Sequence, residues 1–413
     1  MSQSTTKTNT KILVISFLAW TLTNMDQAFF GYAIPGILEE FNLPLEAAGI
    51  ILTISFVIAS MMLLFTGIAA DRFGRGPILS LYLAVSALLV GFQGLAGGIV
   101  MLTIFRALGF GFSAGLSPIT SAYVVENVKP RMRGMAMGVL QCGYPLGWFI
   151  ASLFAGPLLA DYGWRAMCFA AFLVVPLAGL FHWLLRDTPG IILTGSDAPI
   201  KGKVRVLFSA PYRKSSLASI ATYFAFGGAY AGSAFYFPTF FAEVRGYSQS
   251  DAASLVGMSN FIGIGGYLLA AFVGEYLLTR RAVFVVWALG GTLALIGLLW
   301  FSESRTADTI WYGLTAALFY GSLAVLPVLV AEIFPKEVRA SALSVCASAP
   351  LSLGFAVFPL MVPFVVGSVG WQMGFTIIIC PLLALSAITA LALPNRQSGH
   401  DLAVMDETRS IRL

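Results

Sequence analysis

Long apolar runs make up most of this sequence, and they limit the possible folds more than any other feature. About twelve runs are long enough for a helix to cross the ~30 Å core of a bilayer, which takes about 20 residues. Of the 413 residues, 58% are apolar and only 10% are charged. A water-soluble domain of this length needs more charge to cover its surface. We therefore predict an all-α membrane protein whose main partner is the lipid bilayer, not nucleic acid.

The apolar runs divide into two sets of six. We expect helices near 11–38, 46–70, 77–96, 99–127, 134–160 and 165–186, and again near 213–244, 250–278, 282–301, 306–332, 339–367 and 370–393. The predicted organisation is an N-terminal six-helix half (11–186), a cytoplasmic linker (187–212), a C-terminal six-helix half (213–393) and a cytoplasmic tail (394–413).

The basic residues indicate the orientation of the chain. Most of the 24 Lys and Arg residues fall in the links on the side of the N-terminus, and cytoplasmic loops carry such an excess. We expect both termini in the cytoplasm and, as the location, the inner membrane of a bacterium. The first apolar run is too long for a signal-peptide core and is expected to remain as a membrane helix.

The two halves share an internal repeat. The step from Glu126 to Arg133 in "ENVKPRMR" recurs 206 positions later from Glu332 to Arg339 in "EIFPKEVR". The pair Gly163-Trp164 recurs as Gly370-Trp371 at an offset of 207. Two matches at nearly one offset indicate two six-helix pseudo-repeats, an arrangement that transporters use to form a central site.

Three motifs resemble the major facilitator superfamily. "GIAADRFGRG" (67–76) is similar to its signature loop, "RALGFGFSAG" (106–115) to its fourth helix, and "EIFPKEVR" (332–339) to the loop after helix ten in its sugar porters and organic-solute relatives. The resemblance implies a twelve-helix secondary active transporter that works by alternating access as a monomer. Such a transporter needs no cofactor beyond the proton gradient.

Two subfamilies share features with this chain. "QCGYPLGW" (141–148) resembles a segment of metabolite and aromatic-acid proton symporters. Sugar porters carry sugar-binding amides at the positions of Gln141 and Asn260, and "FYFPTFF" (235–241) resembles the end of their helix seven. Their helix-ten tryptophan, however, aligns with Pro327. A sugar needs many hydrogen-bond partners, so a sugar or polyol symporter is retained only as an alternative.

Two charges stand deep inside predicted membrane helices, where charges are costly and usually functional. Asp26 lies about 15 residues into the first helix, roughly 22 Å from one surface, and Arg106 lies roughly 10 Å from the other. In a ~30 Å core these depths nearly coincide. The resemblance implies that the two helices meet and that Asp26 and Arg106 couple protons to transport.

The chemistry of this pair predicts a mechanism. A buried carboxylate is protonated more readily than one in water, whereas a nearby arginine opposes protonation. Protonation of Asp26 would free Arg106 to bind an anion, which predicts proton-coupled uptake of a small carboxylate with an apolar or aromatic body. The open alternatives are a permanent ion pair that pins two helices and a proton-coupled drug or metabolite efflux antiporter.

The remaining site residues follow from the resemblance, which implies a cavity lined by helices one, four, seven and ten. The predicted substrate-binding residues are Arg106, Gln27, Gln141, Tyr144, Tyr230, Asn260 and Tyr320. The predicted gating residues, in loops and at helix ends, are Asp71, Arg72, Arg75, Glu126, Arg133, Glu332 and Arg339. An aromatic residue could instead face lipid, and a gating charge could be a solvated helix end.

Enzyme chemistry finds little support in the sequence. "GFSAG" (111–115) matches a serine-nucleophile pattern, but that pattern needs a strand–turn–helix and a histidine partner. Here it falls in the middle of a predicted helix, and His182 and His400 are the only histidines. Small residues for close helix packing explain it better. We expect no catalytic residues and no metal site.

Overall fold

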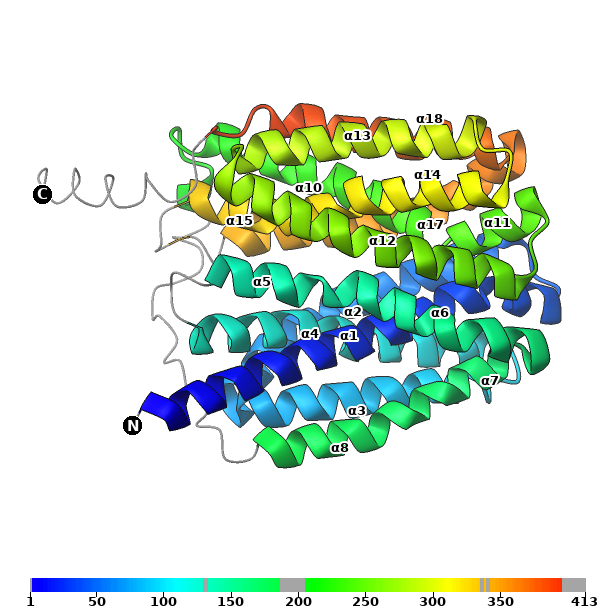
Figure 1. The fold of residues 1–413 in the computed structure, drawn as a ribbon, viewed down its shortest axis with the longest axis horizontal. Helices are drawn as coiled ribbons and strands as arrows, with labels where there is room; N and C mark the ends of the chain where they lie inside the picture. The colour runs from blue at the N-terminus through cyan, green and yellow to red at the C-terminus, as the bar shows by residue number, and fades with distance from the viewer. Residues whose placement is uncertain (1, 129–132, 186–204, 335–337, 339–341, 396–413) are drawn as a thin grey trace, which may run out of the picture. The chain divides into compact units, whose positions relative to one another are not determined.

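The computed structural model describes residues 2–128, 133–185, 205–334, 338 and 342–395 (Figure 1). Within these residues every regular element is a helix, and no strand occurs. Eleven helices of the described part are long and apolar enough to cross a membrane. The predicted all-α membrane class is therefore confirmed, and the chain is a multi-pass membrane protein.

The helices of the N-terminal half follow the predicted runs within a few residues, except for an earlier start of the first. They are α1 (Ser2–Glu40), α2 (Leu45–Phe73), α3 (Arg75–Gln93), α4 (Ile99–Asn127), α5 (Arg133–Gln141), α6 (Gly143–Asp161), α7 (Gly163–Ala170), the 3-10 helix η2 (Ala171–Leu173) and α8 (Val174–Leu185). Two predicted spans are each divided, one at Cys142 between α5 and α6 and one at η2 between α7 and α8.

The C-terminal helices also follow the prediction. They are α10 (Arg213–Ala234), α11 (Phe237–Arg245), α12 (Gln249–Tyr276), α13 (Arg280–Trp300), α14 (Arg305–Leu318), the 3-10 helix η3 (Tyr320–Ala324), α15 (Leu326–Ile333), the π-helix η4 (Leu343–Ser348), α17 (Ala349–Val369) and α18 (Trp371–Ala390). Helices α10 and α11 fill the predicted seventh run, although they are not among the eleven apolar spans.

The chain packs into two compact units. Unit 1 comprises Met1–Gly195, Ala231–Phe261 and Phe355–Phe375, and unit 2 comprises Ser196–Tyr230, Ile262–Gly354 and Thr376–Leu413. In unit 1, α1 packs against α4 and α6, and α4 packs against α2 and α3. Unit 1 therefore encloses the two helices that carry the deep charges.

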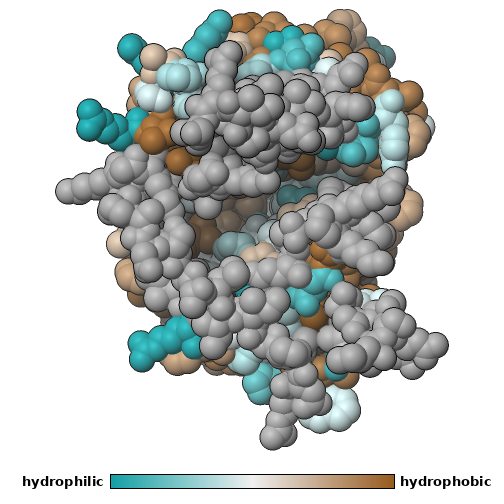
Figure 2. All heavy atoms as spheres, turned by 90° about the vertical axis from the view of Figure 1, so that its left-hand side faces the viewer, coloured by the Kyte–Doolittle hydropathy of each residue, from teal (hydrophilic) through white to brown (hydrophobic). Residues whose placement is uncertain are grey.

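Large apolar side chains also remain exposed along many helices. Val100, Trp183 and Leu293 are each more than half exposed, and Figure 2 shows hydrophobic residues at the molecular surface beside hydrophilic ones. A membrane helix meets lipid tails that are as apolar as its own side chains, so this exposure suits a membrane protein.

Glycines explain two motifs of the sequence. A Cβ atom added at Gly147 would lie 2.8 Å from the Cβ of Asn24, and one at Gly143 would meet Thr21. The two glycines of "GYPLG" therefore let α6 approach the backbone of α1 closely, as small residues do in membrane helix pairs. Gly111 and Gly115 of "GFSAG" leave room on α4 for the side chains of Met62 on α2 and Tyr82 on α3, so this motif serves helix packing.

The Gly-Trp repeat takes the same form in both copies. Gly163 and Gly370 have φ angles of 74° and 81°, a left-handed conformation that suits glycine. The indole Nε1 of Trp164 donates to Glu40 Oε2 over 2.7 Å. The indole Nε1 of Trp371 donates to Glu243 Oε2 over 2.8 Å. Each copy thus ties the start of one helix to the end of another, which supports the predicted pseudo-repeat.

Candidate functional site

Asp26 lies in the middle of α1 and is only 1% exposed. The hydroxyl of Ser86, on α3, donates a hydrogen bond of 3.4 Å to its Oδ2 atom. Its Oδ1 atom has no hydrogen-bond partner among the described residues. Asp26 therefore combines deep burial with a single long hydrogen bond.

Arg106 lies on α4 and is equally buried, at 1% exposed. Its guanidinium carbon lies 4.2 Å from the centroid of the Phe30 ring and 4.9 Å from that of Phe110. Both rings are within the distance at which an aromatic face attracts a cation. The Nε and Nη2 atoms have no hydrogen-bond partner in the described part of the chain. The side chain is thus held between two rings with donors left over.

Asp26 and Arg106 share one buried region of unit 1. Phe30 follows Asp26 by one helical turn on α1, so the two side chains leave the same face of the helix. Arg106 packs on Phe30, and its charge interacts with that of Asp26. No ion pair joins the two side chains within the described residues. The structure places them near each other but not in contact.

Gln27 connects the same turn of α1 to α4. Its Nε2 atom lies 3.5 Å from the Oγ atom of Ser113, to which it donates, and Ser113 in turn donates to the Thr23 carbonyl over 3.3 Å. This amide therefore contacts α4 at Ser113, two helical turns after Arg106.

The other predicted substrate residues fall in both units. Gln141 and Tyr144, in unit 1, are half-buried on either side of Cys142. Asn260 is buried in the same unit and donates its amide to the Val256 carbonyl of its own helix, over 2.9 Å. The rings of Tyr230 and Tyr320 lie 4.9 Å apart in unit 2. Within unit 2, therefore, these two tyrosines form one cluster.

The predicted gating residues are described only in part. Arg72 is exposed with its guanidinium 5.4 Å from the Phe73 ring, and Arg75 is buried at the start of α3. Glu332 pairs with Arg280, which also binds Glu275 over 2.6 Å. The side chains of Asp71, Glu126 and Arg133, and the whole of Arg339, lie outside the described residues.

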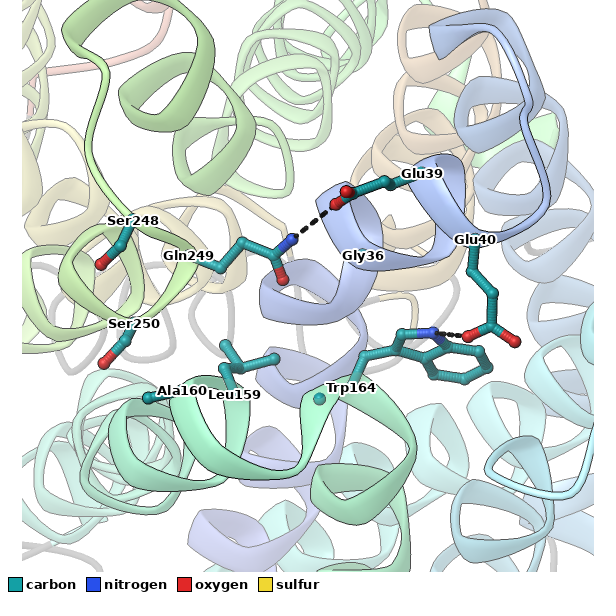
Figure 3. A pocket seen from close by; sticks show the side chains of 10 residues that line it. Gly36, Glu39, Glu40, Leu159, Ala160, Trp164, Ser248, Gln249 and Ser250 are labelled. Atoms are coloured by element: carbon teal, nitrogen blue, oxygen red, sulfur yellow. Dashed lines mark hydrogen bonds between the residues drawn. The ribbon is translucent and has the colours of Figure 1, made fainter.

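A cavity of about 650 Å³ lies at the end of α1 in unit 1 (Figure 3). Gln249 reaches toward Glu39, and its Nε2 donates to Oε2 over 3.4 Å. Beside it, Glu40 accepts from Trp164 and pairs with Arg165 over 2.6 Å. None of the predicted substrate residues lines this cavity.

Three residues of the site carry no clear signal in the sequence. Ser86, Phe30 and Phe110 sit in apolar runs in which serine and phenylalanine are common. Helical spacing was the only available pointer, since Phe30 lies four residues after Asp26 and Phe110 four residues after Arg106. The described residues contain no group of three or more His, Cys, Asp or Glu that could hold a metal ion.

Comparison with known proteins places the chain among membrane transporters. The sequence model of the Major Facilitator Superfamily matches residues 13–327. The cis,cis-muconate transport protein of Acinetobacter baylyi is 27% identical, with 93% of this chain and 94% of that protein aligned. The gallate transporter of Pseudomonas putida is 24% identical, with 94% and 91% aligned. The crystal structure of a D-xylose-proton symporter superposes with a TM-score of 0.75 at 18% identity, covering 93% of this chain and 98% of the other.

Proposed function

Because the chain belongs to the Major Facilitator Superfamily, whose members are transporters rather than enzymes, we propose that it takes up a small organic carboxylate together with a proton. The observation that carries this proposal is the buried Arg106, which has unpaired donors in the described structure and packs on Phe30, one helical turn after Asp26 on α1. The transport cycle is alternating access between two states of the protein.

Arg106 supplies the anion-binding half of the mechanism. A guanidinium stays charged at any physiological pH, and its planar fork matches the two oxygens of a carboxylate. Two of its nitrogens lack hydrogen-bond partners in the described structure, and burying such donors is costly unless a ligand binds them. The flanking rings of Phe30 and Phe110 favour a substrate whose body is apolar or aromatic.

Asp26 supplies the proton-coupling half. A buried carboxylate with one long hydrogen bond is costly, and taking up a proton removes that cost. Protonation also removes the negative charge that competes with a substrate carboxylate for Arg106. One proton and one monovalent anion together carry no net charge, so the pH difference alone drives this cycle.

The names of the relatives agree with this substrate class. Muconate and gallate, the substrates named for the two aligned transporters, are small organic acids. A sugar needs many hydrogen-bond partners, and the helix-ten tryptophan of the sugar porters is replaced here by Pro327, so a sugar or polyol stays the alternative substrate class. Gln27, Gln141, Tyr144, Tyr230, Asn260 and Tyr320 remain the proposed substrate contacts.

Other parts of the proposal rest on the sequence. We propose that the protein lies as a monomer in the inner membrane of a bacterium, with both termini in the cytoplasm. The proton gradient is its proposed energy source. The gating bridges Glu126–Arg133 and Glu332–Arg339 remain predictions. In the described structure Glu332 forms an ion pair with Arg280, which we add to the proposed gating residues.

A thermal-shift screen of the purified protein tests the substrate class. Small aromatic and aliphatic carboxylates, neutral sugars and lipophilic cations are compared at two pH values, with wild type and Arg106→Ala in parallel. We expect stabilisation by carboxylates that is stronger at the lower pH and absent in Arg106→Ala. Stabilisation by lipophilic cations alone would contradict carboxylate symport and favour a proton-coupled efflux antiporter. Stabilisation by sugars alone would contradict the carboxylate assignment and favour a sugar symporter.

A further inference from the structure

Two buried serines on α3 make different hydrogen bonds. Ser80 donates to the Gly76 carbonyl of its own helix over 3.1 Å. Ser86, which is fully buried, donates across to the carboxylate of Asp26 on α1. The two residues share their type, their helix and their burial, but only Ser86 contacts a charged group.

The bond made by Ser80 is the usual one for a buried hydroxyl in a helix. Serine and threonine side chains in membrane helices commonly bond the carbonyl of the preceding turn, as Ser55 and Thr120 also do here. Ser86 does not bond the preceding turn. Its hydroxyl points to the neighbouring helix α1 and donates to Asp26, the one side-chain hydrogen bond of Asp26 in the described structure.

We propose that Ser86 is a positioning residue for proton coupling, holding the Asp26 carboxyl in place in both protonation states. This inference rests on the proposed function of Asp26. A hydroxyl can donate to a carboxylate and, after rotation, accept from a carboxylic acid. Ser86 therefore keeps one hydrogen bond with Asp26 when the proton binds and when it leaves, without any movement of α3.

The charges around Asp26 make this contact consequential. Arg106 on α4 is the charged group whose electrostatic interaction reaches Asp26, but no ion pair to Arg106 forms in the described structure. While Arg106 packs on Phe30, the hydroxyl of Ser86 is what stabilises the charged form of Asp26 directly. Ser86 thereby helps to set the pH at which Asp26 exchanges its proton.

The test compares Ser86→Ala with Ser80→Ala in proteoliposomes. Proton-driven uptake of a carboxylate that the thermal-shift screen has identified is measured against external pH. Loss of the donor destabilises the charged form of Asp26, so Ser86→Ala should move half-maximal uptake to higher pH by roughly 0.5–1 unit. Ser80→Ala should leave the midpoint unchanged, and Ser86→Thr, which keeps the hydroxyl, should restore it.

Two further variants separate the possible failures. Ser86→Cys keeps nearly the same side-chain volume but has a weaker hydrogen-bond donor, so it should shift the uptake midpoint in the same direction. It keeps the proposal testable if Ser86→Ala does not fold. In an Asp26→Asn background, counterflow exchange should be insensitive to Ser86→Ala. If the uptake midpoints of Ser86→Ala, Ser86→Cys and Ser80→Ala were the same, the role of Ser86 would be overturned, but the proposed function would not. Unchanged proton-driven uptake in Asp26→Asn would instead overturn the proposed function.

Discussion

The guanidinium of Arg106 packs on the ring of Phe30, 4.2 Å from its centroid, rather than against the carboxylate of Asp26 one turn earlier. An aromatic face stabilises a cation without occupying its hydrogen-bond donors. Phe30 therefore stabilises the buried charge of Arg106 and, under the proposed function, leaves its donors free to bind a carboxylate. A permanent ion pair with Asp26 would remove that capacity.

Replacing Arg106 by lysine tests the need for a planar group. Lysine keeps the charge but offers one ammonium in place of the two-pronged guanidinium. We expect Arg106→Lys to weaken carboxylate binding at least about tenfold, because a bidentate charge-assisted contact is lost. Isothermal titration of the purified protein measures this change. Wild-type affinity in Arg106→Lys would show that charge alone suffices.

Phe30→Leu tests the aromatic support of Arg106. Loss of a cation–π contact of about 1 kcal/mol should weaken carboxylate binding about fivefold. Phe29→Leu is the matched control, because Phe29 is a neighbouring, fully buried residue of the same helix. Both affinities are measured by the same titration. Equal effects of the two substitutions would mean that Phe30 contributes only packing.

Gly147→Ala tests the close contact between α1 and α6. The added methyl group would meet the Thr21 carbonyl and the Asn24 side chain, and overpacking of this kind costs about 1–3 kcal/mol. We expect a lower unfolding temperature in detergent. Gly179→Ala is the control, because a Cβ at that exposed helical position meets no atom within 4 Å. A drop of the same size in Gly179→Ala would contradict the packing explanation.

Tyr236→Phe tests a hydrogen bond that compensates for a proline. Pro363 has no N–H group to satisfy the Pro359 carbonyl one turn earlier, and the Tyr236 hydroxyl donates to that carbonyl over 2.7 Å. Removing the hydroxyl should cost about 1–3 kcal/mol of stability, seen as a lower unfolding temperature. Tyr223→Phe should cost little, since the buried Tyr223 hydroxyl has no hydrogen-bond partner in the described residues. A larger loss in Tyr223→Phe would refute this account.

The sequence predicted the helices well because apolar length is a strong signal. A run long enough to cross a bilayer must form a helix that satisfies its own backbone. Most predicted boundaries therefore lie within a few residues of the observed ones, as for α2, α4 and α13. The breaks at Cys142 and between Ala234 and Phe237 were not predicted. They depend on how neighbouring helices pack, which hydropathy does not record.

The site was predictable only where a residue was rare. Asp26 and Arg106 stood out because charges seldom occur inside membrane helices, and the structure places both in one buried region of unit 1. Ser86 did not stand out, because a serine in an apolar run usually bonds its own helix, as Ser80 does. Its contact with Asp26 arises from the way α3 faces α1, which is a tertiary relationship.

Transport by Asp26→Asn tests the central claim most directly. In proteoliposomes loaded with a carboxylate substrate, proton-driven uptake and counterflow exchange are measured on the same preparation. If Asp26 carries the coupled proton, the variant should lose uptake driven by a pH difference but keep counterflow exchange. Undiminished proton-driven uptake in Asp26→Asn would contradict the account.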